Sequence, residues 1–349
     1  MDTKVVLINE NIIDIKAIEE AGRIIREGGL VAFPTETVYG LGANALDFNA
    51  VKKIFEAKGR PQDNPLIIHV ADFEIGKFVR EVPIIAENLM KNFWPGPLTI
   101  ILKKSKLIPD ITSAGLDSIA IRMPCNTIAR ELIKSAGVPI AAPSANISGR
   151  PSPTDVSRCI EDLSGKIEYI LGGCICEIGL ESTIVDCSVY PPCVLRPGGV
   201  TLDMLHKIDR KIYMDEAIMN KPNNDFKPKA PGMKYRHYAP KAPLKIVRGD
   251  LQKTVAKINE IVQNYIDDKK LVGIMATDET VNQYNNGYVL SLGSRKKLNI
   301  IGKNLFEILR RFDDANVDII LSEAIEEKGL GIAIMNRLKK SSGFNIIEI

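Results

Sequence analysis

The stretch "FPTETVYGLG", from Phe33 to Gly42, places a cluster of polar side chains directly after an apolar run. The run Leu30–Phe33 has the length and composition of a buried strand. Two threonines, a glutamate and a tyrosine follow it, and this much hydrogen-bonding capacity at a strand end favours a ligand site. Gly40, Gly42 and Ala45 also satisfy the loose dinucleotide pattern G-x-G-x-x-A, so an NAD site is a competing interpretation.

Length and composition indicate an ordinary globular protein of two domains. The chain has 349 residues, 45% of them hydrophobic and 26% charged, and a domain takes roughly 150 residues. A formal net charge of +3 is too small to argue for nucleic-acid binding by itself. Polar residues interrupt the N-terminal apolar runs, and no apolar segment of membrane length follows. We therefore expect a cytoplasmic protein.

The cysteines give no sign of a metal site. They form no C-x-x-C pair, and in a chain of this size we expect most of them to be buried thiols. The only histidines, His69, His206 and His237, lack the spacing of zinc ligands. The six cysteines are Cys125, Cys159, Cys174, Cys176, Cys187 and Cys193.

Hydrophobic periodicity divides the chain into three parts. Residues 1–208 alternate many short strands with intermittent helices, which predicts an α/β domain with a twisted mixed sheet. Residues 209–243 are rich in proline, lysine and aromatic residues and are predicted to be a linker. Residues 244–349 resume a regular alternation, which predicts a smaller, Rossmann-like three-layer α/β domain.

Two cations flank a glycine in "KGRPQDNPLIIH". Lys58 and Arg60 can converge on a polyphosphate, since an ammonium and a guanidinium fork are complementary phosphate binders. They can equally be a helix C-terminal cation and a solvated loop residue. His69, at the end of the next strand, is by itself more typical of a structural histidine than of a catalytic base.

A second polar cluster follows a buried strand in "AAPSANISGR". Ser144, Asn146 and Ser148 supply neutral groups suited to phosphate oxygens, although a self-capping turn has the same composition. Arg122 and Arg196 each end an apolar run, where an arginine needs an anionic ligand or a buried carboxylate. There is no Walker A motif and no nucleophile elbow. Catalysis by positioning and charge stabilisation is therefore the natural expectation.

Taken together and in order, these stretches resemble the L-threonylcarbamoyladenylate synthase family in its two-domain form, a YrdC-like catalytic domain plus a C-terminal domain. The segments are "PTETVYGLG", "KGRPQDNPL", "WPGPLT", "AIRMP", "APSANISG", "ESTIVD", "VLRPGG" and "PGMKYRHYAP". The family makes L-threonylcarbamoyl-AMP and pyrophosphate from L-threonine, bicarbonate and ATP, the first step of threonylcarbamoyladenosine modification of transfer RNA. The resemblance implies a nucleotidyltransferase.

The resemblance also implies roles for individual residues. Lys58, Arg60, Ser144 and Asn146 match the family's catalytic signature around the ATP phosphates. The positions that match L-threonine contacts are Thr35, His69, Arg122, Ala142 and Ser182. The further positions that match ATP contacts are Ser118, Ser152, Arg196 and Tyr235. No protein metal site is implied, and Mg²⁺ is expected to be held mainly by the ATP phosphates.

The same resemblance gives the linker and the partners of the protein. We expect "PGMKYRHYAP" to form a lid that brings Tyr235 to the nucleotide, and a downstream threonylcarbamoyl-transfer machinery acting on transfer RNA to consume the product. The alternative of a different class is an RNA-binding module without adenylate synthesis, which predicts salt-dependent RNA binding that needs no threonine.

Overall fold

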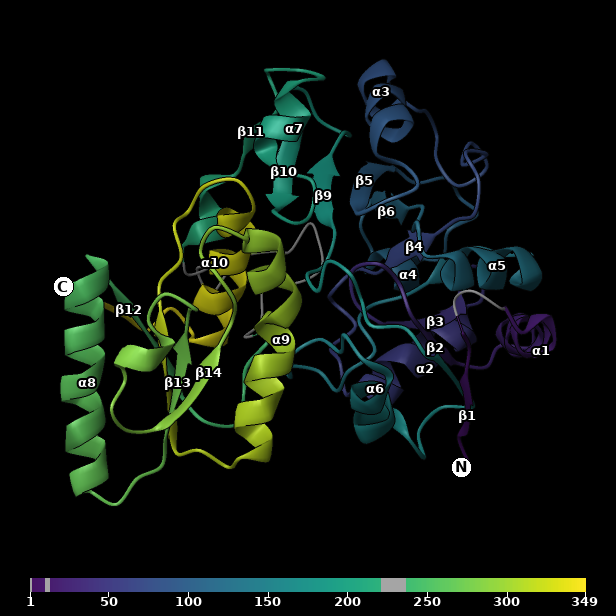
Figure 1. The fold of residues 1–349 in the computed structure, drawn as a ribbon. Helices are drawn as coiled ribbons and strands as arrows, with labels where there is room; N and C mark the ends of the chain where they lie inside the picture. Colours follow the sequence, from purple (N-terminus) through teal and green to yellow (C-terminus); the bar gives the residue numbers. More distant parts are fainter. Residues whose placement is uncertain (1, 10–12, 221–236) are drawn as a thin grey trace.

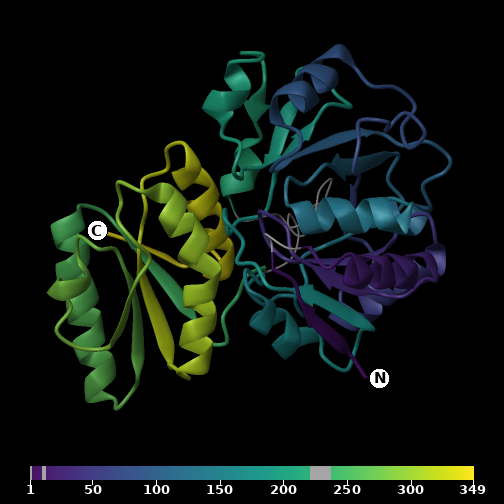
Figure 2. The ribbon, with the colours of Figure 1, turned by 45° about the vertical axis from the view of Figure 1, so that its right-hand side comes forward.

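The protein consists of two bodies, each built around its own sheet (Figures 1 and 2). A computed structural model describes residues 2–9, 13–220 and 237–349. The larger body contains the chain up to Met214, and the smaller body contains the chain from Leu244. No helix in the described parts of the chain is long and apolar enough to cross a membrane.

The larger body is built on an eleven-stranded sheet in the order β1-β8-β2-β3-β7-β4-β6-β5-β9-β10-β11. Parallel pairs such as β4 with β6 alternate with antiparallel pairs such as β2 with β3, so the predicted mixed sheet is confirmed. Its last strand lies within the stretch expected to be linker. The strands are β1 Lys4–Leu7, β2 Val31–Phe33, β3 Gly40–Asn44, β4 Ile67–His69, β5 Leu98–Lys103, β6 Ser118–Arg122, β7 Ile140–Ala141, β8 Tyr169–Gly172, β9 Thr183–Asp186, β10 Cys193–Arg196 and β11 Tyr213–Met214.

Helices cover both faces of this sheet. Helices α1 and α5 pack with one face, while α2, α3 and α6 contribute to the larger core on the other. Local sequence sets several helix ends, because Asp47 accepts hydrogen bonds from the first turn of α2, and Gly59 ends that helix with a φ of 60°. The helices are α1 Ile15–Arg26, α2 Phe48–Lys58, α3 Ile84–Phe93, α4 Asp110–Ser113, α5 Thr127–Ala136, α6 Val156–Leu163 and α7 Leu202–His206.

The two glycines of the dinucleotide pattern lie inside strand β3. Gly42 pairs with Val31 of the antiparallel strand β2. A Cβ at Gly42 would lie 2.7 Å from Ile140 Cγ2 and 2.8 Å from a Phe33 ring carbon, so close packing explains the glycine. A dinucleotide fingerprint needs a turn from a strand into a helix N-terminus. The geometry removes the basis of the NAD interpretation.

The smaller body is a three-layer α/β domain, as predicted. Its five strands are all parallel, in the order β14-β13-β15-β12-β16. Helix α8 packs with one face of the sheet, and α9 and α10 pack with the other. The strands are β12 Leu244–Arg248, β13 Val272–Ala276, β14 Tyr288–Ser291, β15 Ile319–Glu323 and β16 Ile346–Glu348; the helices are α8 Leu251–Asp267, α9 Leu298–Asp314 and α10 Leu330–Ser341, with short 3₁₀ helices η1 Glu216–Met219 and η2 Val281–Gln283.

Helices α9 and α10 face the larger body (Figures 1 and 2). Leu180 of the larger body is fully buried in the core of the smaller one. Gly179 has a φ of 70°, and a Cβ there would lie 2.4 Å from the Cα atom of Lys303 in α9. The backbones of the two bodies therefore approach as closely as a glycine allows.

Candidate active site

The polar side chains predicted from the sequence gather around one cavity in the larger body. The cavity lies along β4, β6 and β7, and the loops before β9 and after β2 close it. The structure brings together predicted residues from six separate motifs. The predicted residues that line it are Thr35, Arg60, His69, Arg122, Ala142, Ser144, Ser182 and Arg196.

Arg122 is held by three hydrogen bonds in the wall of this cavity. Its Nη1 donates to Thr37 Oγ1 at 2.8 Å, its Nη2 to Glu36 Oε1 at 2.5 Å, and its Nε to the carbonyl of Gly96 at 3.3 Å. A guanidinium has five N–H donors. Two donors therefore remain for a ligand, which suits the carboxylate of an amino acid.

The loop after β2 is shaped by the hydroxyl of Thr35. This hydroxyl donates to the carbonyl of Val38 at 2.6 Å and accepts from the backbone amides of Thr37 and Val38 at 3.2 and 3.3 Å. Such side-chain bonds fix a turn without a helix or a strand. The turn holds Thr37 against Arg122 and explains the polar end of this strand.

His69 is a neutral side chain in the lining of the cavity. It is buried, and it pairs in register with Arg122 on the neighbouring parallel strand. Burial and the positive charge of Arg122 lower the pKa of His69 to about 3. Its Nδ1 has no hydrogen-bond partner among the described residues. At neutral pH the imidazole can hydrogen-bond a ligand but carries no charge.

Ser182 and Arg196 form another part of the lining. Arg196 donates from Nη2 to Ser182 Oγ at 3.1 Å and from Nε to the Ser182 carbonyl at 3.0 Å. The Ser182 hydroxyl also lies 2.7 Å from Thr99 Oγ1. Burial lowers the pKa of Arg196 to about 10, so the side chain is still a cation at neutral pH.

Lys58 lies behind the cavity rather than in its lining. It is the last residue of α2, and its Nζ donates to the carbonyls of Ser144 (2.5 Å) and Asn146. Burial and the charge of Arg60 hold the pKa of Lys58 well below its usual range. Arg60 follows the left-handed Gly59 and does line the cavity. Arg60 therefore lies in the cavity lining, and Lys58 lies behind it against the backbone of Ser144 and Asn146.

The chain from Ser144 to Pro151, which we call the phosphate loop, is held from several sides. Asn146 Nδ2 donates to the carbonyls of Ile147 (2.8 Å) and Arg150 (3.0 Å), and the Ser148 amide donates to the Lys58 carbonyl at 2.9 Å. Asn146 Oδ1 is buried and has no partner within the described residues. A buried acceptor without a partner is costly unless a ligand supplies a donor.

Ser118 and Ser152, two of the predicted ATP-contacting residues, stand apart from the cavity lining. Ser152 is buried and donates to Glu181 Oε1 at 2.6 Å, one layer behind the wall. Ser118 begins β6, at the opposite end of the strand from Arg122. Tyr235 lies outside the residues that the structure describes.

The lining residues that were not assigned from the sequence include Glu181, His237 and Tyr238. Burial and the charge of Glu181 raise the pKa of Tyr238 to about 12, and the Tyr238 ring stacks on Phe306 at 5.1 Å. The sequence did point to two of them, because His237 and Tyr238 belong to the aromatic segment "KYRHY" that was expected to form the lid. Arg337 of α10, which donates to Glu181 Oε2 at 2.8 Å, gave no signal, since nothing in the sequence shows that the second domain reaches this site.

The cavity offers a metal ion little protein ligation. Within residues 2–9, 13–220 and 237–349, no three His, Cys, Asp or Glu side chains lie close enough to hold a metal ion. Glu181 is the one carboxylate among the described lining residues, and its two oxygens are bound by Ser152 and Arg337. A divalent cation that enters with a polyphosphate would be held mainly by the phosphate oxygens.

The fold and the cavity define a YrdC-like enzyme of the adenylate-forming kind, with a second α/β domain. A protein-family model described as "Telomere recombination" matches residues 23–198, and one described as "Threonylcarbamoyl-AMP synthase, C-terminal domain" matches residues 200–343. Threonylcarbamoyl-AMP synthase of Pyrococcus abyssi is 50% identical over 99% of this chain and 100% of its own length. The Bacillus subtilis synthase is 46% identical over 95% of this chain and 94% of its own length.

Solved structures of such proteins also resemble this chain. The crystal structure of P. abyssi Sua5 complexed with L-threonine has a TM-score of 0.93 and 49% identity to this chain, and it covers 100% of both chains. Escherichia coli YciO resembles the larger body alone, with a TM-score of 0.52 and 27% identity over 56% of this chain and 96% of its own. This chain belongs to the threonylcarbamoyl-AMP synthase family, in its two-domain form.

Proposed function

We propose that this protein condenses L-threonine, bicarbonate and ATP to L-threonylcarbamoyl-AMP and pyrophosphate, and so acts as a nucleotidyltransferase. One observation carries the proposal: the cavity joins a wall suited to an amino-acid carboxylate, around Arg122, to a cationic wall suited to phosphates, around Arg60 and the phosphate loop. The membership of the family and the L-threonine complex of the P. abyssi relative support it.

L-Threonine is assigned to the side of the cavity near β4 and β6. The remaining donors of Arg122 suit the threonine carboxylate, and the neutral His69 and the Thr35 loop offer hydrogen bonds for its polar groups. Ala142 presents only a methyl group to the same cavity. This small side chain leaves room for the substrate methyl group that distinguishes threonine from serine.

ATP is assigned to the side formed by Arg60, Arg196 and the phosphate loop. Carboxylation of the threonine amine gives a carbamate, whose oxygen attacks the α-phosphorus of ATP. A carbon–oxygen–phosphorus linkage forms, and the bond to the β-phosphate oxygen breaks as pyrophosphate leaves. The site must therefore hold two anions, the carbamate and the triphosphate of ATP, next to each other. Arg60 and Arg196 provide positive charge beside the phosphates, Lys58 holds the carbonyls of Ser144 and Asn146 in the phosphate loop, and Mg²⁺ bound to the phosphates would neutralise further charge.

The linker is assigned to closing this cavity. The described end of the segment "PGMKYRHYAP" already lies at the site, since His237 and Tyr238 line the cavity and the amide of Ala239 donates to the carbonyl of Gly149 at 2.8 Å. The remainder, including Tyr235, falls outside the described residues. A lid at this place would exclude water from a labile acyl phosphate anhydride.

The product fixes the class of reaction that must follow. A mixed anhydride of a carbamic acid and AMP is an activated donor, so its natural consumer is a transferase that moves the threonylcarbamoyl group onto a nucleophilic amine. By the family relationship we assign that acceptor to an adenosine of transfer RNA.

The proposal is tested by measuring pyrophosphate release from ATP with purified protein, with and without L-threonine and bicarbonate. Release that needs both establishes adenylate synthesis. Release that is indifferent to threonine contradicts the proposal and indicates a plain ATPase. No release together with tight, salt-dependent RNA binding favours the binding module instead.

A further inference from the structure

A buried arginine of the second domain is bound to the larger body. Arg310, on α9, is 1% exposed and faces the larger body rather than its own domain core. Its Nη1 and Nη2 donate to the two oxygens of Asp162 at 3.0 and 2.7 Å, and its Nε and Nη2 donate to the carbonyl of Pro151 at 3.1 and 2.7 Å. Pro151 ends the phosphate loop.

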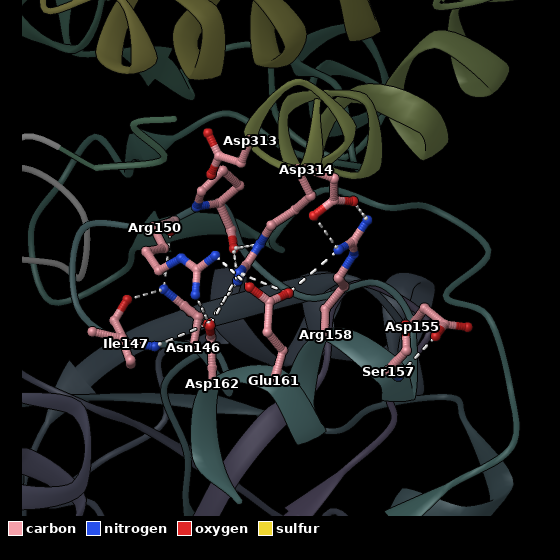
Figure 3. A network of polar contacts seen from close by, with 12 residues as sticks. Asn146, Ile147, Arg150, Asp155, Ser157, Arg158, Glu161, Asp162, Asp313 and Asp314 are labelled. Carbon is pink, nitrogen blue, oxygen red and sulfur yellow. Dashed lines mark hydrogen bonds and ion pairs between the residues drawn. The ribbon is translucent and has the colours of Figure 1, made fainter. Parts of the chain in front are cut away.

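Asp162 in turn is bound to the phosphate loop. It lies on α6 and its side chain is fully buried. Asp162 Oδ2 accepts from the backbone amide of Ile147 at 3.2 Å, and Oδ1 accepts from Arg150 Nη1. Figure 3 shows Asp162 below the stretch from Asn146 to Arg150, with the dashed contacts converging on its carboxylate. One carboxylate thus joins α9 to the middle of the loop.

These contacts act on the part of the loop that carries Asn146. The Asn146 amide is oriented by the carbonyls of Ile147 and Arg150, and both residues are bound to Asp162. A displacement of Ile147 or Arg150 would therefore turn the unpartnered Oδ1 of Asn146. Misplacement of a binding group by about 1 Å is enough to weaken binding or catalysis strongly.

Arg310 differs in this respect from another arginine at the same interface. Arg158 of α6 donates to Glu307 at 2.7 and 3.0 Å and to Asp314 at 2.8 and 3.2 Å, and both acids lie on α9. Figure 3 shows Asp314 bound to Arg158 on the side away from Asn146 and Ile147. Arg158 therefore joins the two bodies through acids of α9, and its link to the phosphate loop is indirect. The partly exposed Glu161 accepts from Arg158 Nη1 at 3.3 Å and from Arg150 Nη2 at 2.6 Å.

From this geometry we infer that Arg310 is a positioning residue for ATP, which acts through Asp162 on the phosphate loop, so that the C-terminal domain shapes the nucleotide site of the larger body. This inference rests on the proposed function for the identity of the nucleotide. It assigns the second domain a task in the reaction of the first. It also explains why a charged side chain is buried where a packed apolar residue would be an ordinary choice.

The test compares Arg310→Met and Asp162→Asn with the matched control Arg158→Met in the full-length chain. ATP and L-threonine dissociation constants are measured by calorimetry, and thermal unfolding is followed in parallel. We expect both phosphate-loop variants to weaken ATP binding by about tenfold or more, with threonine binding within about twofold of wild type. The double variant Arg310→Met/Asp162→Asn should weaken ATP binding by less than the product of the two single effects, because both changes break one linkage.

The control variant Arg158→Met should leave both dissociation constants within about twofold of wild type, even if it lowers the unfolding temperature. Equal losses of ATP binding in Arg158→Met and Arg310→Met would overturn the inference, because the cause would then be general loosening of the interface. If Arg310→Met does not fold, Arg310→Lys keeps a cation but loses the fork, and unchanged ATP binding in that variant would equally overturn it. Threonine-dependent pyrophosphate release by the wild type is measured on the same preparations, since its absence refutes the proposed function and not the linkage.

Discussion

Arg122 and Glu36 form a buried ion pair in the wall of the active-site cavity, with 2.5 Å between Nη2 and Oε1. Glu36 Oε2 also accepts from the amide of Cys125 at 3.2 Å, so the carboxylate is held in place from two sides. A substrate carboxylate at Arg122 must therefore share the guanidinium with Glu36. Since a guanidinium can bind two carboxylates through separate edges, the arrangement favours arginine over lysine at this position.

We expect the substitution Arg122→Lys to raise the KM for L-threonine by about tenfold or more, because one ammonium cannot replace the contacts to Glu36, Thr37 and a substrate carboxylate together. Steady-state pyrophosphate release at varied threonine measures it. The dissociation constant for ATP should change by less than about threefold, because ATP is assigned to the other side of the cavity. A threonine KM equal to that of the wild type would remove Arg122 from the threonine site.

We expect Lys58→Met to slow adenylate formation by about 30-fold or more, which corresponds to roughly 2 kcal/mol of lost transition-state stabilisation. Methionine keeps most of the buried volume but loses the bonds from Nζ to the carbonyls of Ser144 and Asn146. Single-turnover formation of threonylcarbamoyl-AMP at saturating substrates measures the chemical step. A wild-type rate would exclude Lys58 from the mechanism.

Discrimination between threonine and serine should be modest. The two substrates differ by one methyl group, which is worth roughly 1 to 3 kcal/mol in a fitted pocket. We therefore expect serine to be a substrate, with kcat/KM lower by about 10- to 100-fold. Parallel assays with the two amino acids test the assignment, and equal values of kcat/KM would contradict a pocket fitted around Ala142.

The lid hypothesis predicts an effect on product fate rather than on binding alone. Deletion of residues 230–240 should raise the amount of pyrophosphate released per threonylcarbamoyl-AMP recovered, because water would reach the labile anhydride. The deletion also removes His237 and Tyr238, which line the cavity. Chromatographic quantification of both products gives the ratio, and a ratio equal to that of the full chain would refute the lid.

Helices and strands were predictable from the sequence where an apolar run or a helical hydrophobic periodicity indicates them directly. The run Leu30–Phe33 predicted a buried strand, and the structure has β2 over Val31–Phe33, fully buried. Strand β3, Gly40–Asn44, contains the two glycines of the dinucleotide pattern, and its sequence does not indicate a strand because glycine is depleted in strands. The close approach of Phe33 and Ile140 requires a glycine there, and such a tertiary contact leaves no local signal in the sequence.

The site residues that belong to short motifs of the larger body were predictable from the sequence. The residues that the second domain contributes were not. Arg122, His69 and Ser144 belong to short polar clusters at strand ends, and they line one cavity. Arg310 and Arg337 lie on helices α9 and α10, whose amphipathic sequences do not show which charged residues face another domain, so burial of these arginines against the larger body could not be foreseen. Buried arginines become informative only when their carboxylate partners, Asp162 and Glu181, are known.

The titration of His69 predicts how stability depends on pH. The pKa of His69 falls to about 3 in the folded protein because of burial and the nearby charge of Arg122, whereas an unfolded histidine has a pKa of about 6.5. Between these values the unfolded chain binds more protons than the folded one. The free energy of unfolding is therefore greatest above pH 6.5 and falls as the pH is lowered, by up to about 1.4 kcal/mol per pH unit for one such group.

We expect His69→Gln to lose less stability on acidification than the wild type. Between pH 6.5 and pH 5 the wild type should lose roughly 1.5 kcal/mol more than the variant, because glutamine takes up no proton on unfolding. Urea-induced unfolding at pH 8, 6.5 and 5 measures this, and the difference at pH 8 gives the cost of the substitution itself. His237, whose pKa is also lowered to about 3 by burial and by Arg60, contributes to the acid loss in both proteins. Parallel pH profiles for the two proteins would show that His69 has the same pKa in the folded and unfolded states, and the lowering of its pKa by burial and Arg122 would then be wrong.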